Sequence, residues 1–289
     1  MTSYNEVRRA KRKSIKWKKI PDTAITYTII LLVGFIFLFP VLWLILSSFS
    51  AQGSMYDFDG FFPKNYSLAT YIKLFTDTAM YNYPKWFGNT LFIASMSCII
   101  GTTLVVLTAY AVSRFNFSSR KKLMKVTLVL GMFPSFMGMI AVYLLMVQFG
   151  LVNNHWGLIL IYSSGAPMGY LVQKGFFDTI PITIDEAATI DGANKFQIFI
   201  HILMPLSKPM FVYTALTSFT WPWSDFILPK LLLKQKDMYT VAVGLMSLGE
   251  DEFARFAAGS LFVAIPIIIL YFFLSKYMIS GLSSGAVKE

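Results

Sequence analysis

The stretch TYTIILLVGFIFLFPVLWLILSS, residues 26–48, decides the class of this protein. It contains no charged residue and is long enough to cross the hydrocarbon core of a bilayer, which takes about 20 mostly apolar residues. Over all 289 residues, 56% are hydrophobic and only 14% are charged, whereas a soluble domain has about 25% charged residues. The composition therefore excludes a soluble enzyme and a disordered chain, and the single cysteine, Cys98, excludes a disulfide scaffold.

Five more apolar stretches predict an all-α membrane protein with six transmembrane helices. The expected spans are 26–48, 89–114, 126–149, 157–177, 210–228 and 257–278, within a transmembrane domain over 26–281. Pro167 and Pro222 interrupt the fourth and fifth spans, so we expect these two to be buried among other helices, where freed backbone groups find partners. The first apolar run is too long for a signal peptide, so we expect none to be cleaved.

Basic residues orient the chain in the membrane. Most of the 25 Lys and Arg residues fall in the N-terminal segment 1–25, in the loop between spans two and three, in the long inner loop 178–208 and at the C-terminal end. The outer loops 49–88 and 229–256 hold fewer. This positive-inside distribution places both termini in the cytoplasm, and it explains the net charge of +10 without a nucleic-acid partner. The cluster RRAKRKSIKWKK, residues 8–19, is either a topology anchor or a binding site for anionic membrane lipid.

The long inner loop carries the strongest local pattern, DTIPITIDEAATIDGANKFQIFIHILMPLSK. We expect two short helices joined at Gly192, because glycine readily takes the positive φ that ends a helix. Thr183 and Glu186 have the spacing of a capping box at the first helix. Asn194 and Gln197 have the same spacing at the second helix. The loop is therefore predicted to be stiff and ordered.

Two interpretations of this loop are open from its residues alone. Ala187 and Ala188 leave a small-residue face that another protein can approach closely, with acidic residues at its rim. Alternatively, Glu186 only caps a helix and an apolar stripe only packs on the helix bundle. The stripe consists of residues at helical spacing: Phe196, Phe199, Ile200 and Leu203.

One pattern in this loop resembles a known signature. It consists of a glutamate and two alanines, a glycine four residues after the last alanine, and an Ile/Leu-rich stretch ending in proline. The known signature is the EAA signature of the permease subunits of bacterial ABC importers that use binding proteins. Its residues in this sequence are Glu186, Ala187, Ala188, Asp191, Gly192 and Pro205. The resemblance covers essentially the whole chain, and MYTVAVGL at 238–245 looks most like the MalG-like permeases of maltose-type carbohydrate importers. It implies the type I ABC importer permease fold.

The resemblance also implies a function and a set of partners. The chain would be a non-catalytic subunit that moves an oligosaccharide of maltodextrin type by alternating access. Its partners would be a second, MalF-like permease, a homodimeric cytoplasmic MalK-like ATPase and an extracellular solute-binding protein. The EAA loop would form a coupling helix seated in a cleft of the ATPase. This chain has no GxxxxGK[ST] motif, so ATP and Mg would bind to the ATPase, and no cofactor is expected here.

Two further contacts follow from the resemblance. The tail 282–289 would reach the ATPase, unless it is only a frayed terminus. The tail residues expected there are Gly285, Val287 and Lys288. The last outer loop would reach into the ligand cleft of the binding protein. The loop residues expected there are Gly244, Leu245 and Gly249.

One acidic residue falls inside a predicted span. An intramembrane carboxylate is a functional hypothesis by default, so Asp225 and its neighbour Trp221 are candidates for the wall of the translocation path. Alternatively, Asp225 lies at the outer membrane boundary and is simply hydrated. His155 and His201 are the only histidines, and neither HExxH nor paired cysteines occur, so we expect no metal site.

The alternative function is a stand-alone secondary transporter of a small polar solute. Acid–base chains of the kind that relay protons are missing from the spans, which counts against an ion-coupled pump. A membrane enzyme would need an acid–base pair or a metal set, and the sequence offers neither.

Overall fold

The computed structural model describes residues 2–58, 61–164 and 167–285. Across these ranges the regular structure is helical, with one isolated antiparallel bridge between Ser50 and Tyr66, which confirms the predicted all-α class. The chain divides into two compact units. The first is formed by residues 1–71 and 250–258, and the second by 72–249 and 259–289.

The first unit is dominated by helix α1 (Thr2–Ser48). The apolar part of α1 corresponds to the first predicted span, and the helix continues backward through the basic segment. After α1 come the single turn η1 (Met55–Asp57) and helix α2 (Ala69–Thr76), which crosses into the second unit. The turn η4 (Glu250–Glu252) returns to the first unit, where the Ala254 amide donates to the Gly53 carbonyl at 3.1 Å.

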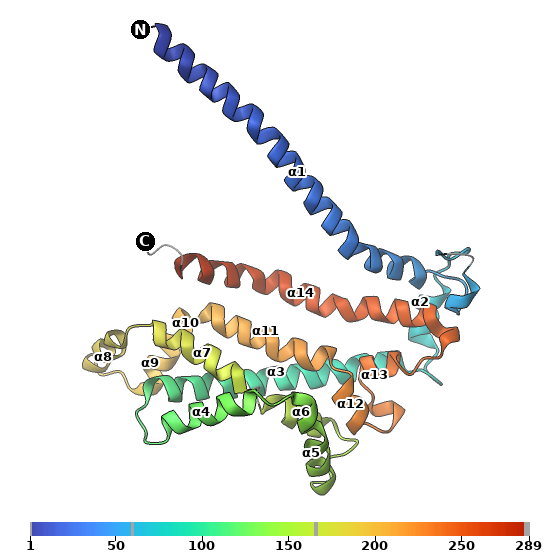
Figure 1. The fold of residues 1–289 in the computed structure, drawn as a ribbon. Coiled ribbons are helices and arrows are strands. Elements are labelled where there is room, and N and C mark those ends of the chain that lie inside the picture. Colours follow the sequence, from blue (N-terminus) through green and yellow to red (C-terminus); the bar gives the residue numbers. More distant parts are fainter. Residues whose placement is uncertain (1, 59–60, 165–166, 286–289) are drawn as a thin grey trace. The chain divides into compact units, whose positions relative to one another are not determined.

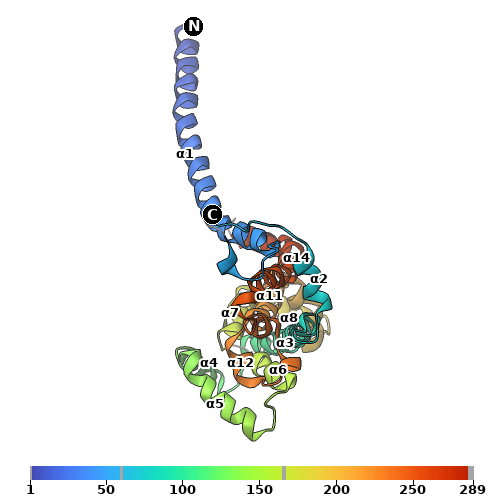
Figure 2. The same ribbon diagram turned by 90° about the vertical axis from the view of Figure 1, so that its right-hand side faces the viewer.

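The second unit is a bundle around helix α3 (Tyr83–Arg114). Figures 1 and 2 show α7 (Pro167–Thr179) and α11 (Lys208–Ser224) alongside α3. Helix α6 (His155–Ser163) also contacts α3, and α4 (Arg120–Gly131) contacts α7. Small residues let α3 and α6 approach closely. A Cβ on Gly101 would lie only 3.6 Å from the Ser163 Cα. Helix α14 (Phe253–Gly285) begins in the first unit and continues into the second.

The predicted spans are only partly continuous helices. Three stretches are long and apolar enough to cross a membrane: Thr23–Ser48, Tyr83–Arg114 and Glu250–Tyr277. The predicted span 126–149 corresponds to α4 and α5 (Ser135–Gln148), which together are apolar enough for one span but bend by 105° at the break between them, where Pro134 lies. The fifth span ends at Ser224 rather than 228, since Asp225 is extended. The fourth, 157–177, corresponds to α6 and α7 on either side of 165–166. Six spans remains a prediction.

The two ends of the bundle carry different loops, as Figure 1 shows. At the Arg114 end lie α8 (Ile182–Ile190), α9 (Lys195–Ile198), the π-helical turn η2 (Phe199–Leu203) and α10 (Met204–Leu206). At the Tyr83 end lie α12 (Ile227–Leu232), η3 (Lys236–Met238) and α13 (Val241–Leu245). The predicted inner and outer loops therefore lie at opposite ends of α3, as a membrane-spanning α3 requires.

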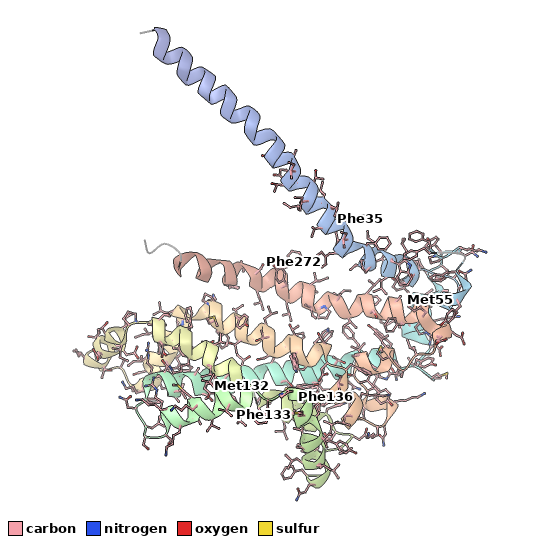
Figure 3. The ribbon with its side chains drawn as sticks, viewed as in Figure 1. Phe35, Met55, Met132, Phe133, Phe136 and Phe272 are labelled. Atoms are coloured by element: carbon pink, nitrogen blue, oxygen red, sulfur yellow. The ribbon has the colours of Figure 1, made fainter. Side chains whose placement is uncertain are left out.

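Large apolar side chains cover much of the outside of each unit. Figure 3 labels Phe35 on α1, Met132, Phe133 and Phe136 at the α4–α5 bend, and Phe272 on α14. Phe136 is 70% exposed and Phe272 is 72% exposed. A surface of this kind would be a liability in water and is typical of contact with lipid or with another membrane subunit.

Candidate functional site

Helix α8 carries the predicted signature and begins directly after a proline. Pro181 adopts φ −56° and ψ 135°, and α8 starts at the next residue. The capping box predicted for Thr183 and Glu186 is wrong: among the described residues no side chain caps this helix. Thr183 already lies inside the first turn, so its hydroxyl is misplaced for the cap. Glu186 is exposed, which leaves its carboxylate available to a partner.

Helix α8 ends in a Schellman motif centred on Gly192. The Gly192 amide donates to the Thr189 carbonyl at 3.1 Å, and the Ala193 amide donates to the Ala188 carbonyl at 2.9 Å. Gly192 has φ +87°, a conformation that other residues adopt only with strain. The predicted glycine stop is confirmed, and the direction of the chain into α9 depends on it.

Helix α9 begins with the predicted capping box. The Gln197 amide donates to Asn194 Oδ1 at 2.9 Å, and the Asn194 amide donates to Gln197 Oε1 at 2.8 Å. The apolar stripe is only partly as predicted. Phe199 and Leu203 are buried, but Phe196 is 69% exposed, and Ile198 takes the buried position instead.

A buried ion pair ties this loop to the end of α3. Arg114 Nε lies 3.0 Å from Asp185 Oδ2, and both side chains are 6% exposed. The same guanidinium donates from Nη2 to the Ile180 carbonyl at 3.0 Å. Removing two charges from water is costly, so the pair is stable only while both partners hold this geometry. The first turn of α8 is therefore fixed to the last residue of α3.

A second polar contact joins α3 to the end of α7. Ser113 Oγ donates to Asp178 Oδ1 at 2.7 Å, and Lys174 forms an ion pair with Asp178 Oδ2. Burial raises the pKa of Asp178, but hydrogen bonds from Lys174 and Ser113 outweigh this effect, and the pKa lies below its ordinary value. Asp178 is therefore an anion at neutral pH. One turn earlier in α3, the Tyr110 hydroxyl donates to the Lys195 carbonyl at 2.8 Å.

An apolar cluster supports the loop from beneath. The rings of Tyr110 and Phe199 lie 4.7 Å apart between centroids. The buried members of the cluster come from α3, α7, α9 and the segments beside them: Val106, Ala109, Tyr110, Phe177, Ile180, Ile198, Phe199 and Leu203. The α8–α9 pair is thus mounted on the bundle core and is not a free loop.

The outward face of the α8–α9 pair combines small, acidic and apolar residues. Glu186, Ala187, Asp191, Gly192 and Pro205 are exposed, whereas Ala188 is half-buried. The strongest feature is one that sequence reasoning missed. Ile190, one helical turn after Glu186, is 86% exposed. The signal available in the sequence was the position of this isoleucine, at helical spacing from the signature glutamate.

The family described as "Binding-protein-dependent transport system inner membrane component" matches residues 101–282. This protein belongs to that family. The matched residues include the whole α8–α9 pair and the Arg114–Asp185 ion pair. The chain is accordingly a multi-pass inner-membrane permease component. The side of the membrane on which its termini lie is predicted only from the charge distribution.

Individual relatives agree with this assignment. The permease is 37% identical over 281 residues to the maltodextrin transport system permease protein MalD of Streptococcus pneumoniae, covering 95% of this chain and 99% of that protein. It is 36% identical over 268 residues to the galactooligosaccharides transport system permease protein GanQ of Bacillus subtilis, covering 91% and 94%. A solved bacterial ABC transporter involved in the import of the acidic polysaccharide alginate matches with a TM-score of 0.76 at 21% identity, covering 88% and 95%. The permease therefore has the fold of an ABC importer transmembrane subunit.

The three residues predicted to contact a binding protein differ in their exposure. Gly244 and Leu245 are buried, and a Cβ on Gly244 would lie 2.1 Å from Trp86 Cε3. The Trp86 indole also donates to the Lys236 carbonyl at 2.8 Å. Gly244 and Leu245 therefore hold α13 against α3. Gly249 is exposed, and contact of these three residues with a binding protein stays a prediction.

The predicted path residues of the permease differ in their surroundings. Asp225 accepts a hydrogen bond from the Tyr162 hydroxyl at 2.8 Å and one from the Ile227 amide at 2.9 Å. Asp225 thus joins α6 to the α11–α12 junction. Trp221 is 68% exposed. Their role in a translocation path stays a prediction.

The remaining predicted positions have structural surroundings or lie outside the description. The rings of His155 and His201 each meet a backbone carbonyl, at 2.8 Å and 3.1 Å. Across the described residues no group of three metal-ligating side chains gathers. Helix α14 continues through Gly285, whereas Val287 and Lys288 lie outside the described residues.

Proposed function

We propose that this permease is the transmembrane subunit of an ATP-driven importer of an oligosaccharide of maltodextrin type. The similarity to MalD supports the substrate, because it extends over nearly all of both chains. The similarity to GanQ supports the wider class, since that protein's name also specifies an oligosaccharide. A second permease subunit and a binding protein complete the membrane and outer parts of the importer.

The observation that carries the coupling role is the way the α8–α9 pair is held. Two defined turns make the pair stiff, through Gly192 and Asn194, and the Arg114–Asp185 ion pair fixes it to α3. Its outward face offers Ile190 as an apolar anchor beside the small Ala187. A separate ATPase, MalK-like in this proposal, receives this face in a cleft.

In this mechanism α8 and α3 move together. Closure of two ATPase subunits on ATP draws the coupling loops of the two permeases toward each other. The ion pair and the apolar cluster under the loop pass this displacement to α3, and the bundle opens outward. Hydrolysis on the ATPase then resets the inward-open state. The permease itself performs no chemistry.

Reconstitution tests the proposal. The permease is co-expressed with the second permease and the ATPase, purified as a complex and placed in proteoliposomes with the binding protein. We expect uptake of maltotriose that requires ATP inside the vesicles, with galactooligosaccharides and an alginate oligosaccharide as comparison solutes. Uptake by the permease alone, driven by an ion gradient, would instead establish a secondary transporter. ATP-dependent uptake of a comparison solute without maltotriose uptake would overturn the substrate but not the coupling.

A further inference from the structure

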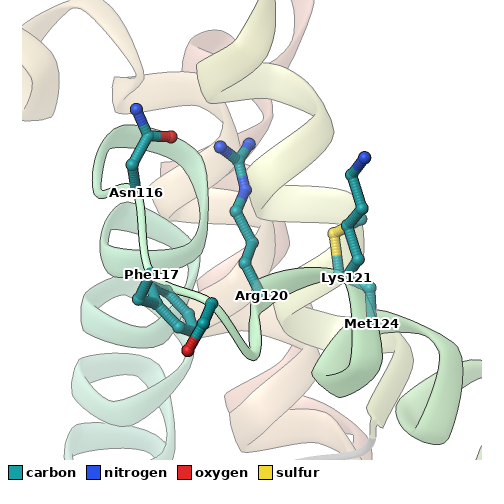
Figure 4. A pocket seen from close by; sticks show the side chains of 6 residues that line it. Asn116, Phe117, Arg120, Lys121 and Met124 are labelled. Carbon is teal, nitrogen blue, oxygen red and sulfur yellow. The ribbon is translucent and has the colours of Figure 1, made fainter.

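The turn between α3 and α4 borders a hollow that the proposed transport function does not use. Its volume is about 740 Å³, and its lining residues are Asn116, Phe117, Ser118, Arg120, Lys121 and Met124. Figure 4 shows the side chains of Asn116, Arg120 and Lys121 pointing to the same side of the turn. An amide, a guanidinium and an ammonium therefore border one space.

The charge around this hollow is one-sided. The segment 115–131 contains Arg120, Lys121, Lys122 and Lys125 and no acidic residue. The carboxylate of Asp178 interacts electrostatically with Arg120, but it already accepts hydrogen bonds from Ser113 and Lys174. One partly engaged carboxylate does not balance four cations, so the hollow favours an anionic ligand.

The residues after the hollow establish its depth in the membrane. Immediately beyond Lys125, the apolar side chains Val126, Val129 and Leu130 are each more than half exposed. A helix rises 1.5 Å per residue, so Leu130 lies only about 15 Å along α4 from Arg120. Lipid-facing apolar residues therefore begin within one or two turns of the basic ones. The hollow lies at the headgroup level, on the side that the charge distribution places in the cytoplasm.

The lining also has an apolar part. Phe117 is 41% exposed, and Met124 is half-buried. Aromatic and thioether side chains next to cations suit a ligand that is charged at one end and apolar at the other. A free inorganic anion would leave these two side chains unused.

We infer that this hollow binds one anionic phospholipid of the inner leaflet. The phosphate lies between Arg120 and Lys121, and the Asn116 amide donates to the phosphate or to a headgroup hydroxyl. The guanidinium provides paired donors to phosphate oxygens, and the ammonium adds a point charge. Phe117 and Met124 contact the glycerol backbone and the first acyl carbons. This site is separate from the N-terminal basic cluster 8–19 and does not depend on the transported solute.

Native mass spectrometry of the purified complex in neutral detergent tests the site. In a neutral micelle there is no charged bilayer surface, so a retained lipid reports a bound one. The probe is phosphatidylglycerol, titrated against phosphatidylcholine of the same acyl chains. The test variant is Arg120→Gln/Lys121→Gln. The matched control is Lys122→Gln/Lys125→Gln, which removes the same charge from the same helix at positions that do not line the hollow.

We expect the wild type to retain one phosphatidylglycerol in preference to phosphatidylcholine. The test variant should bind it at least about tenfold more weakly, since each basic residue at an anionic lipid contributes about fivefold in affinity. The control should change by less than about threefold. Arg120→Lys/Lys121→Arg keeps the charge and should retain most of the affinity, which assigns the loss in the test variant to its missing charges.

Three results would overturn the proposal. Equal losses in the test variant and the control would mean diffuse surface charge. Equal retention of the two lipids would mean an apolar contact without headgroup recognition. Displacement of the lipid by millimolar inorganic phosphate would mean a free-anion site.

Discussion

Arg114, the last residue of α3, and Asp185, in the first turn of α8, form an ion pair at 3.0 Å with both side chains 6% exposed. An acidic residue in the first turn of a helix is also favoured by the helix dipole, so Asp185 is doubly placed for this contact. The pair joins the signature loop to the helix at the centre of the bundle.

Breaking one side of this pair should destabilise the permease. Arg114→Met or Asp185→Asn leaves a buried charge or polar group uncompensated, which costs about 3–5 kcal/mol. The double variant Arg114→Met/Asp185→Leu removes both charges and should recover most of the loss. The measurement is the thermal midpoint of the purified complex. A double variant as unstable as the two single losses combined would contradict the pairing.

Gly192 should be required for coupling to the ATPase but not for insertion of the chain into the membrane. Gly192→Ala forces a Cβ into positive φ, at a cost of about 1–2 kcal/mol, and redirects α9. We expect less ATPase to co-purify and lower ATP-driven uptake at unchanged expression. Gly175→Ala is the matched control, because its Cβ would meet nothing within 4 Å. Normal ATPase recovery with Gly192→Ala would show that the turn geometry is dispensable.

The two ends of the bundle should bind different partners. Ile190→Glu places a charge on the exposed face of α8, and Met246→Glu does the same at the outer end, where Met246 is 61% exposed. Neither change should unfold the protein, since both side chains are exposed. We expect Ile190→Glu to abolish ATPase co-purification while binding-protein affinity stays normal, and Met246→Glu to have no effect on the ATPase. If both variants retained the ATPase equally, α8 would not be the docking face.

Gly244 should be required for the packing of α13 against α3. Gly244→Ala brings a methyl group 2.1 Å from Trp86 Cε3, so α13 or the indole must shift, at a cost of about 1–3 kcal/mol or more. Gly249→Ala, whose Cβ meets nothing within 4 Å, should leave stability unchanged. Fluorescence-detected size-exclusion after heating compares the two. Equal thermal midpoints would mean that α13 is not locked against α3.

Asp178 should contribute stability only while it is ionised. Its folded-state pKa lies below the ordinary value of 3.8, so its contribution is present above that value and is lost as pH falls through the lowered pKa. The difference in thermal midpoint between wild type and Asp178→Asn should stay constant between about pH 6 and 8. A difference that disappears within that window would show that another group controls the contact.

Local signals in the sequence were good predictors where the structure itself is local. The glycine stop at Gly192 and the box at Asn194 depend on residues three to five apart, and both are present. Thr183 was wrongly assigned because Pro181 starts α8 earlier than the spacing indicated. Phe196 fits a helical stripe equally well facing inward or outward, and periodicity alone does not specify which face meets the bundle.

By itself the sequence determined the membrane class, the helical fold, the family and the position of the signature loop. Those properties follow from hydrophobicity, charge and motif spacing, which act along the chain. Only the tertiary structure decided that Arg114 meets Asp185 and that Trp86 closes over Gly244. These contacts depend on which helix faces approach one another across the bundle, and the free energy that selects them comes from packing and burial between residues far apart in the chain.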